Sequence, residues 1–197
     1  MNYQWLRDIN NLSVHSQFLN DLMIWAAKYL IYAVGVALAV LLYQQARRKH
    51  WITIAAVALG LVAAFVFGLI AAAVHPEQRP FTTHPRIHLL VSHAAGGSFP
   101  SDHATAAFAI ALAVIVFVSA RWGLALFVTA VVIGFARVYD GLHYPGDIGG
   151  GLLVAAVGVA VAALALYVAR RRIDPRVVDK YTDSPTRGSR SAVSGPA

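Results

Sequence analysis

Long apolar segments alternate with short polar segments along most of this 197-residue chain. Five segments are apolar enough to form transmembrane helices: residues 22–43, 52–74, 103–120, 123–139 and 148–168. A helix that crosses a bilayer needs about 20 mainly apolar residues, and each segment is close to that length. The pattern therefore predicts an all-α protein, a polytopic membrane bundle of about five transmembrane helices.

The two ends of the chain differ from its apolar middle. The first 17 residues mix polar and apolar positions, which predicts a short interfacial helix, and neither a basic start nor a small-residue cleavage site marks a signal peptide. After "ARRRIDPR" the chain is rich in Ser, Pro, Gly and Arg, a composition typical of disorder. We expect a single membrane domain over residues 1–180 and a disordered cytoplasmic tail over residues 181–197.

Composition agrees with a membrane protein and narrows the chemistry. Hydrophobic residues make up 58% of the chain and charged residues 13%, whereas a soluble domain usually has about 25% charged residues. The chain has no cysteine, which excludes a disulfide, a thiol nucleophile and a thiolate metal site. The net charge of +7 is compatible with nucleic-acid binding. However, the basic residues lie mostly beside apolar segments, which favours membrane lipids as partners and no nucleic acid.

The positions of lysine and arginine predict the orientation in the membrane. Basic residues follow the first, third and fifth apolar segments, and cytoplasmic loops have an excess of Lys and Arg. These residues are Arg47, Arg48, Lys49, Arg121, Arg170, Arg171, Arg172, Arg176 and Lys180. The N-terminus and residues 74–100 and 140–147 then lie outside the cell. We expect a multi-pass plasma-membrane protein whose unusual polar clusters share the extracytoplasmic face.

The first of three polar clusters on that face is "HPEQRPFTTHPR", which closes the second apolar segment. Its Arg79 is either an interfacial arginine that reaches the headgroups or a residue that binds an anionic substrate. Three histidines, His84, His88 and His93, lie in the same loop. Pro85 separates the first two, and no glutamate completes a zinc pattern such as HExxH. We therefore expect no metal site and no cofactor.

The second cluster, "FPSDHATAAF", opens the third apolar segment. A helix that starts here should not extend toward the N-terminus through Pro100, and Ser101 is a preferred N-cap residue. The sequence therefore predicts that a helix begins at this point. The free N–H groups of a helix N-terminus bind anions, phosphate in particular. Ordinary capping explains Ser101 and in part Asp102, but it does not explain His103.

The third cluster, "ARVYDGLHYPGDIGGG", joins the fourth and fifth apolar segments. Arg137 is followed six residues later by His143 and then, after four more, by Asp147. Pro145 suits the first turn of the next helix, so Asp147 can reach back to one ring nitrogen of His143. Such a carboxylate fixes the tautomer and makes the other nitrogen more nucleophilic. The glycines that follow suit a close helix–helix contact.

Taken singly, each of these polar residues also fits a solvated loop. Together the clusters would bring two arginines, a helix N-terminus, two histidines and a carboxylate to one face of the membrane. Guanidinium groups bind phosphate oxygens in pairs, and fixed positive charge can replace the metal ion that stabilises phosphoryl transfer in other enzymes. The combination therefore predicts metal-free phosphoryl transfer.

The three clusters also resemble the signature of the type 2 phosphatidic acid phosphatase superfamily. That signature reads K-x6-R-P, then P-S-G-H, then S-R-x5-H-x3-D, and here "RP" begins at Arg79, "PSDH" covers residues 100–103 and "ARVYDGLHYPGD" keeps the spacing of the third motif. Ala72 stands at the lysine of the first motif, Asp102 at the glycine of the second and Ala136 at the serine of the third. The "PSDH" form, the small size and the opening "MNYQWLRDINNLS" resemble the bacitracin-resistance type of undecaprenyl-diphosphate phosphatase.

The resemblance implies a role for each matching residue. His143 matches the nucleophile that forms a phosphohistidine, Asp147 its orienting carboxylate, and His103 the general acid for the leaving group. The positions that bind phosphate in the family are Arg79, Arg137 and Ser101. For Asp102, which would repel a phosphate, the resemblance leaves pairing with an arginine or tuning of His103.

The branch that the sequence resembles removes one phosphate from a C55 polyprenyl diphosphate lipid outside the membrane, so that the carrier can be reused in cell-wall synthesis. The resemblance therefore implies hydrolysis of undecaprenyl diphosphate, peptidoglycan biosynthesis and bacitracin resistance. Two alternatives stay open: a phosphatase for phosphatidylglycerophosphate or phosphatidate, and a protein that binds or transports a lipid headgroup without hydrolysis. Binding alone does not need the pair of His143 and Asp147.

The predicted orientation can be tested with topology reporters. Reporters fused after Arg48 and after Arg172 should give a cytoplasmic signal, because both sites lie in the basic segments. A reporter near Thr83 should give an extracytoplasmic signal. A cytoplasmic signal at Thr83 would place the polar clusters on the inner face and contradict the prediction.

Overall fold

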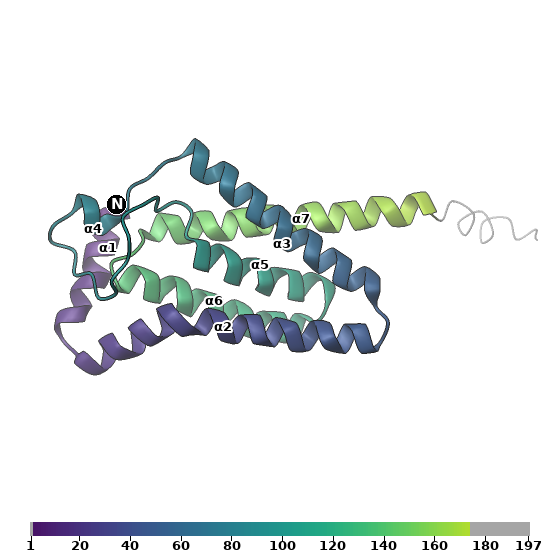
Figure 1. Ribbon diagram of the computed structural model, residues 1–197, viewed down its shortest axis with the longest axis horizontal. Helices are drawn as coiled ribbons and strands as arrows, with labels where there is room; N and C mark the ends of the chain where they lie inside the picture. The colour runs from purple at the N-terminus through teal and green to yellow at the C-terminus, as the bar shows by residue number, and fades with distance from the viewer. Residues whose placement is uncertain (1, 174–197) are drawn as a thin grey trace, which may run out of the picture. The chain divides into compact units, whose positions relative to one another are not determined.

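Seven α-helices and one 3-10 turn make up the part of the chain that the computed structural model describes, residues 2–173 (Figure 1). In chain order they are α1 (Asn2–Asn10), the 3-10 turn (Asn11–Val14), α2 (Gln17–Arg47), α3 (Trp51–Val74), α4 (Pro80–Thr83), α5 (Asp102–Phe117), α6 (Ala120–Tyr139) and α7 (Pro145–Ile173). Residues 2–164 belong to one compact unit. The end of α7 belongs to a second unit. In this unit, the Arg171 guanidinium lies 4.7 Å from the centre of the Tyr167 ring.

The predicted all-α membrane bundle is confirmed. Helices α2, α3, α6 and α7 are long and apolar enough to cross a membrane, and α5 is a shorter apolar helix. These five helices correspond to the five apolar segments of the sequence, and α1 forms within the first 17 residues as predicted. Large apolar side chains such as Phe65 and Leu69 face outward from the bundle, as lipid contact requires. The tail predicted for residues 181–197 lies outside the described residues.

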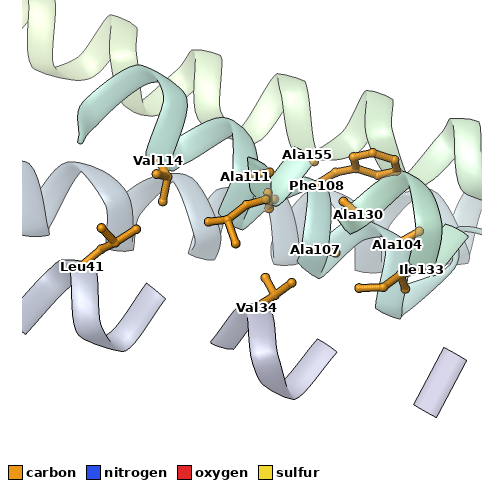
Figure 2. Close-up of a cluster of buried hydrophobic side chains, with 13 residues drawn as sticks. Val34, Leu41, Ala104, Ala107, Phe108, Ala111, Val114, Ala130, Ile133 and Ala155 are labelled. Atoms are coloured by element: carbon orange, nitrogen blue, oxygen red, sulfur yellow. The ribbon is translucent and has the colours of Figure 1, made fainter. Parts of the chain in front are cut away.

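Helix α5 lies among the other helices and supplies much of the core (Figure 2). Eight of its 16 residues are buried, and it packs against α2, α3 and α6. The main cluster joins α5 to α2, α6 and α7 through Val34, Leu41, Ala104, Ala107, Phe108, Ala111, Val114, Ala130, Ile133 and Ala155. With about 1.5 Å per residue, α5 is roughly 24 Å long. That is shorter than the hydrocarbon core of about 30 Å, so the two ends of α5 cannot both reach the membrane surfaces.

Two glycines in the first turns of α7 let this helix approach the start of α5. A Cβ atom at Gly150 would collide with the ring of Phe99, and one at Gly151 would lie 2.9 Å from Thr105 Oγ1 and 3.1 Å from its backbone nitrogen. This close approach allows the Ser101 N–H to donate to the carbonyl of Asp147 at 3.2 Å. The small-residue contact expected from "GDIGGG" is therefore present, and it joins the second polar cluster to the third.

The N-terminal segment is tied to the loop before α5 and to the end of α6 through one buried amide. Asn10 is fully buried, and its side chain donates to the carbonyls of His88 at 2.9 Å and Tyr139 at 2.8 Å. It also accepts from the His88 N–H at 2.8 Å. Nearby, Asn2 Oδ1 accepts from the Gly146 N–H at 2.9 Å. Figure 1 shows the result, with α1 and α4 at the same end of the bundle as the start of α7.

The α5–α7 contact predicts different effects for two glycine substitutions in one helix. Gly151→Ala should destabilise the fold by about 1–3 kcal/mol, because the added methyl group overpacks the buried Thr105. Gly149→Ala is the matched control, since no atom lies within 4 Å of its Cβ position and alanine favours the helix. Thermal unfolding in detergent should show a fall of several degrees for Gly151→Ala alone. Equal melting temperatures for the two variants would contradict the predicted contact.

Candidate active site

Two buried guanidinium groups meet one nitrogen of a buried imidazole at the end of the bundle where α3 ends and α5 and α7 begin. Arg79 Nη1 lies 3.2 Å from His143 Nε2, and Arg137 Nη2 lies 3.3 Å from the same atom. Only 7% of Arg79, 4% of Arg137 and 2% of His143 is exposed. The structure thus brings together an arginine and a histidine that are 64 residues apart.

The opposite edge of the His143 ring contacts a carboxylate. Its Nδ1 lies 3.3 Å from Asp147 Oδ2 and 3.0 Å from the carbonyl oxygen of Ser98. The same Oδ2 accepts from the Tyr144 N–H at 2.8 Å and from the Ser98 hydroxyl. Helix α7 begins at Pro145, which places Asp147 in its first turn as predicted. This turn fixes the carboxylate beside a histidine that is four residues away.

The neighbours of His143 determine its tautomer. A guanidinium group can only donate hydrogen bonds, so Nε2 must accept from Arg79 and Arg137 and the ring proton must lie on Nδ1. Burial lowers the pKa of His143, and the two arginines add to that effect, while the hydrogen bond to Asp147 opposes it. His143 is therefore a neutral imidazole whose Nε2 lone pair points between two positive charges.

Local structure also fixes the arginines. The Arg79 carbonyl accepts from the Thr82 N–H at 3.0 Å and from the Thr82 hydroxyl at 2.7 Å, which anchors Arg79 at the start of the one-turn helix α4. Arg137 extends from the last turn of α6. The Nε atoms of both arginines are buried without a hydrogen-bond acceptor among the described residues. Buried donors normally have partners, so this pair of side chains suits an anion with several oxygens.

The start of α5 adds three more polar residues beside the arginines. Ser101 occupies the N-cap position as predicted, but its hydroxyl makes no capping bond and is buried without a partner within residues 2–173. Capping therefore does not explain the Ser101 side chain. Asp102 is exposed and its charge acts on both arginines, although no ion pair within 4.0 Å forms. His103 is half-buried and close enough for the charges of Arg137 and His143 to act on it.

Comparison with known proteins identifies the family. Residues 51–174 match the model of the PAP2 superfamily, which is more than half of the chain. The chain belongs to the PAP2 superfamily. This confirms the resemblance to the type 2 phosphatidic acid phosphatases, and with it an enzyme of the phosphatase class.

Several individual proteins are similar to this PAP2 chain. The undecaprenyl-diphosphatase BcrC of Bacillus subtilis is 35% identical over 158 residues, which cover 80% of each chain. The putative undecaprenyl-diphosphatase YbjG of Escherichia coli is 36% identical over 177 residues, which cover 88% of this chain and 86% of that one. The crystal structure of Aquifex aeolicus LpxE has a TM-score of 0.67 at 23% identity and covers 82% of this chain and 94% of that one. The last likeness concerns the fold alone.

Two of the three positions that depart from the PAP2 signature lie in different surroundings. Ala136, at the serine of the third motif, is fully buried and packs against Ala26 and Ala27 of α2. Ala72, at the lysine of the first motif, lines a cavity of about 460 Å³ near the C-terminal end of α3. Glu77 and Phe99 line the same cavity. No lysine or arginine lines this cavity, so it contains no cationic side chain in place of the missing lysine.

Ser98 is a site residue that the sequence analysis missed. Only 1% of it is exposed, and it contacts both members of the pair of His143 and Asp147. It precedes "PSDH" but belongs to none of the PAP2 motifs, and a lone serine in a glycine-containing loop gives no periodic signal. Only its position directly before the second cluster could have suggested it.

Asp140 is a second buried carboxyl group near the arginines that the sequence analysis did not single out. It follows α6 directly, is 0% exposed, and neither of its oxygens has a hydrogen-bond partner among the described residues. Burial raises the pKa of Asp140 to about 7, although Arg137 and Lys28 act in the opposite direction. This shift favours the neutral form of the Asp140 carboxyl, which leaves the positive charge of Arg137 available to an anion.

The loop histidines lie apart from this centre. The ring of His84 lies 4.0 Å from that of Tyr3, centroid to centroid, and is perpendicular to the ring of Tyr144 at 6.2 Å. His88 and His93 are exposed. Within residues 2–173, no three His, Asp or Glu side chains are grouped so that they could hold a metal ion. The absence of a metal cofactor stays a prediction.

The surroundings of His143 predict its protonation state. Its titration midpoint should lie below the ordinary value of 6.5, because burial and two guanidinium groups disfavour the charged ring. ¹⁵N NMR of histidine-labelled protein should show a neutral ring with the proton on Nδ1 at about pH 6.5. A His143→Gln variant identifies the signal among the eight histidines. A midpoint at or above the ordinary value, or a proton on Nε2, would contradict this assignment.

Proposed function

We propose that this PAP2 protein is an integral membrane phosphatase that hydrolyses undecaprenyl diphosphate to undecaprenyl phosphate and phosphate through a phosphohistidine at His143. The main support is the neutral imidazole between two buried guanidinium groups, with a carboxylate on its other nitrogen. A site that only binds a headgroup needs the arginines but not a nucleophile with an oriented proton. The proposed substrate rests on the names of the relatives from B. subtilis and E. coli.

In the first step, His143 Nε2 attacks the terminal phosphorus of the diphosphate. The bond between that phosphorus and the bridging oxygen breaks, and the bridging oxygen leaves with the lipid monophosphate. Arg79 and Arg137 bind the oxygens that gain negative charge. The Nδ1–H of His143 stays on the ring and donates to Asp147, which stabilises the positive charge that the phosphorylated imidazole acquires.

In the second step, water attacks the phosphohistidine and releases phosphate. His103, on the first turn of α5 beside Arg137 and His143, accepts the proton of the attacking water. The same residue donates a proton to the leaving group in the first step, so it returns to its starting state after one cycle. Ser101, at the N-cap of α5, adds its hydroxyl and the nearby helix N-terminus to the phosphate-binding groups.

The active site faces the outside of the plasma membrane in this proposal. The residues of the site follow α3, precede α5 and join α6 to α7. The basic residues Arg47, Arg48 and Lys49 lie between α2 and α3, and Arg121 lies at the start of α6. These connections belong to the opposite ends of the same helices, and basic loops are cytoplasmic. A lipid diphosphate in the outer leaflet would therefore present its phosphates to Arg79 and Arg137.

The proposal predicts that two histidine variants differ in their dependence on the leaving group. A lipid diphosphate expels a phosphate monoester, whose relevant pKa is about 6, whereas a lipid monophosphate expels a strongly basic alkoxide. General-acid catalysis contributes about 100- to 10,000-fold, so His103→Ala should damage monophosphate hydrolysis far more than diphosphate hydrolysis. His143→Ala should abolish both activities.

The measurement is kcat/KM for phosphate release by the purified protein, with prenyl monophosphate and diphosphate matched in chain length and phosphatidylglycerophosphate as a third substrate. A higher kcat/KM for phosphatidylglycerophosphate than for the prenyl diphosphate would show that undecaprenyl diphosphate is not the preferred substrate. Equal losses on both prenyl substrates in His103→Ala would exclude it as the general acid. Substantial residual activity in His143→Ala would exclude it as the nucleophile, and absence of any phosphate release by the unmodified protein would leave a binding function.

A further inference from the structure

One face of α1 packs onto the end of the bundle that holds the candidate active site (Figure 1). The residues of this face are buried or half-buried, and they are Asn2, Tyr3, Leu6, Ile9 and Asn10. The residues between them are exposed, and spacings of three and four place a set of residues on one side of a helix. Helix α1 precedes residues 51–174, which match the PAP2 model, so the family match does not account for its contacts.

The first turn of α1 contacts the segment that carries Arg79. The ring of Tyr3 lies 4.0 Å from the ring of His84, centroid to centroid. His84 directly follows the one-turn helix α4, and Arg79 directly precedes it. The His84 N–H donates to the carbonyl of Pro80 at 2.9 Å, which joins the two ends of this short turn. Tyr3 therefore packs against the turn that begins at Arg79.

The middle of α1 contacts the segments that carry the other two groups. Leu6 is fully buried, in one cluster with Val138 and Tyr144. Val138 directly follows Arg137, and Tyr144 directly follows His143. The single side chain of Leu6 thus packs between the last turn of α6 and the residue before α7.

The last residue of α1 holds the loop between α6 and α7. The buried amide of Asn10 bonds to the backbone of His88 and to the carbonyl of Tyr139. The loop then turns at Gly141, which has a φ of +75°. A Cβ atom at Gly141 would lie 2.8 Å from the His88 carbonyl oxygen and 3.3 Å from Asn10 Nδ2. Asn10 and His88 therefore support this turn directly, two residues before His143.

All of these contacts are made to neighbours in the chain, not to the side chains of Arg79, Arg137 and His143. Helix α1 can therefore affect these three groups only through their positions. Their arrangement needs such support, because two guanidinium groups beside the same imidazole nitrogen repel each other. A displacement of about 1 Å can reduce turnover about 100-fold.

We propose that α1 is a positioning element of the active site and that Asn10 is its main positioning residue. Tyr3 holds the Arg79 segment, while Leu6 and Asn10 hold the Arg137 and His143 segments, so both guanidinium groups stay beside His143 Nε2. When the Asn10 bonds are lost, the loop at Gly141 moves and Nε2 is no longer aligned with the phosphate that the arginines bind. The inference rests on the proposed role of His143 as nucleophile.

The first test compares Asn10→Ala with Asn11→Ala, the same change at the next residue, which is exposed. The kcat for phosphate release from a prenyl diphosphate should fall about 10- to 100-fold in Asn10→Ala and stay near its original value in Asn11→Ala. The KM should change far less than kcat, because attack by Nε2 depends on alignment more steeply than binding of the phosphate does. Equal kcat values in the two variants would overturn the inference.

A loss of stability alone is separated from a loss of positioning by Val57→Ala. Val57 is fully buried near the start of α3, in a cluster with Ala113 and Val159, so its truncation lowers the melting temperature in detergent. Measured well below the melting temperatures, Val57→Ala should keep its kcat. An equal fall of kcat in Val57→Ala and Asn10→Ala would overturn the inference.

Tyr3 provides a second pair of variants in case Asn10→Ala does not fold, because Tyr3 is only half-buried. Tyr3→Ala removes the ring that packs on His84 and should lower kcat/KM several-fold. Tyr3→Phe keeps the ring and should restore the original value. Equal activity of Tyr3→Ala and Tyr3→Phe would exclude the contact with His84 as part of the positioning and would overturn the inference.

The last test does not depend on activity and therefore separates this inference from the proposed function. In Asn10→Ala, the ¹⁵N titration midpoint of the His143 ring should move toward the ordinary value of 6.5, because the guanidinium groups are no longer held beside Nε2. It should stay in place in Asn11→Ala and Val57→Ala. An unchanged midpoint in both Asn10→Ala and Tyr3→Ala would overturn the inference even if the protein is a phosphatase. A moved midpoint in a protein that releases no phosphate would support positioning by α1 and contradict the proposed function.

Discussion

Two positive charges held in the protein interior without a direct carboxylate partner are the constraint on which the rest of this structure depends. Arg79 and Arg137 both contact His143 Nε2, and neither forms an ion pair within residues 2–173. Burying a charge without a partner is strongly unfavourable. An anion with several oxygens removes much of this penalty, so the arrangement favours a bound phosphate over the empty site. Two like charges on one side of the imidazole also keep it unprotonated, which is the form a nucleophile requires.

The surroundings of these charges follow from that constraint. The arginines come from segments that are far apart in the sequence. The C-terminal ends of α3 and α6 must therefore both lie level with the start of α7. Small residues make this possible, because Gly150 and Gly151 bring α7 against Phe99 and Thr105. Helix α5 begins in the same place, and its N–H at Ser101 is bonded to the backbone of Asp147. Packing in the apolar core and geometry in the polar site are thus parts of one arrangement.

The sequence predicts the bundle and part of the site for separate physical reasons. Helix positions follow from apolar length, and the contact of His143 with Asp147 follows from four-residue spacing across a helix start. Arg79 is 64 residues from His143, so no local rule connects them, and they were assigned to one site by the shared membrane face of the polar clusters and by the motif resemblance. The position of Ser98 depends on how an irregular loop folds back onto α7. At Ser101 the sequence predicts too much. Serine is a preferred N-cap residue and Ser101 does occupy the N-cap position, but its hydroxyl makes no capping hydrogen bond.

The buried side chain of Asn10 has a consequence for how the molecule is made. Its amide bonds to His88 and Tyr139, which follow it by 78 and 129 residues. Synthesis at about 5–20 residues per second separates Asn10 from Tyr139 by on the order of ten seconds. During that interval α2 and α3 can enter the membrane, while the polar amide of Asn10 stays in water. The N-terminal segment therefore takes its final position only after α6 has been made, and the end of the molecule that contains Asn10 is completed last although its first residues are made first.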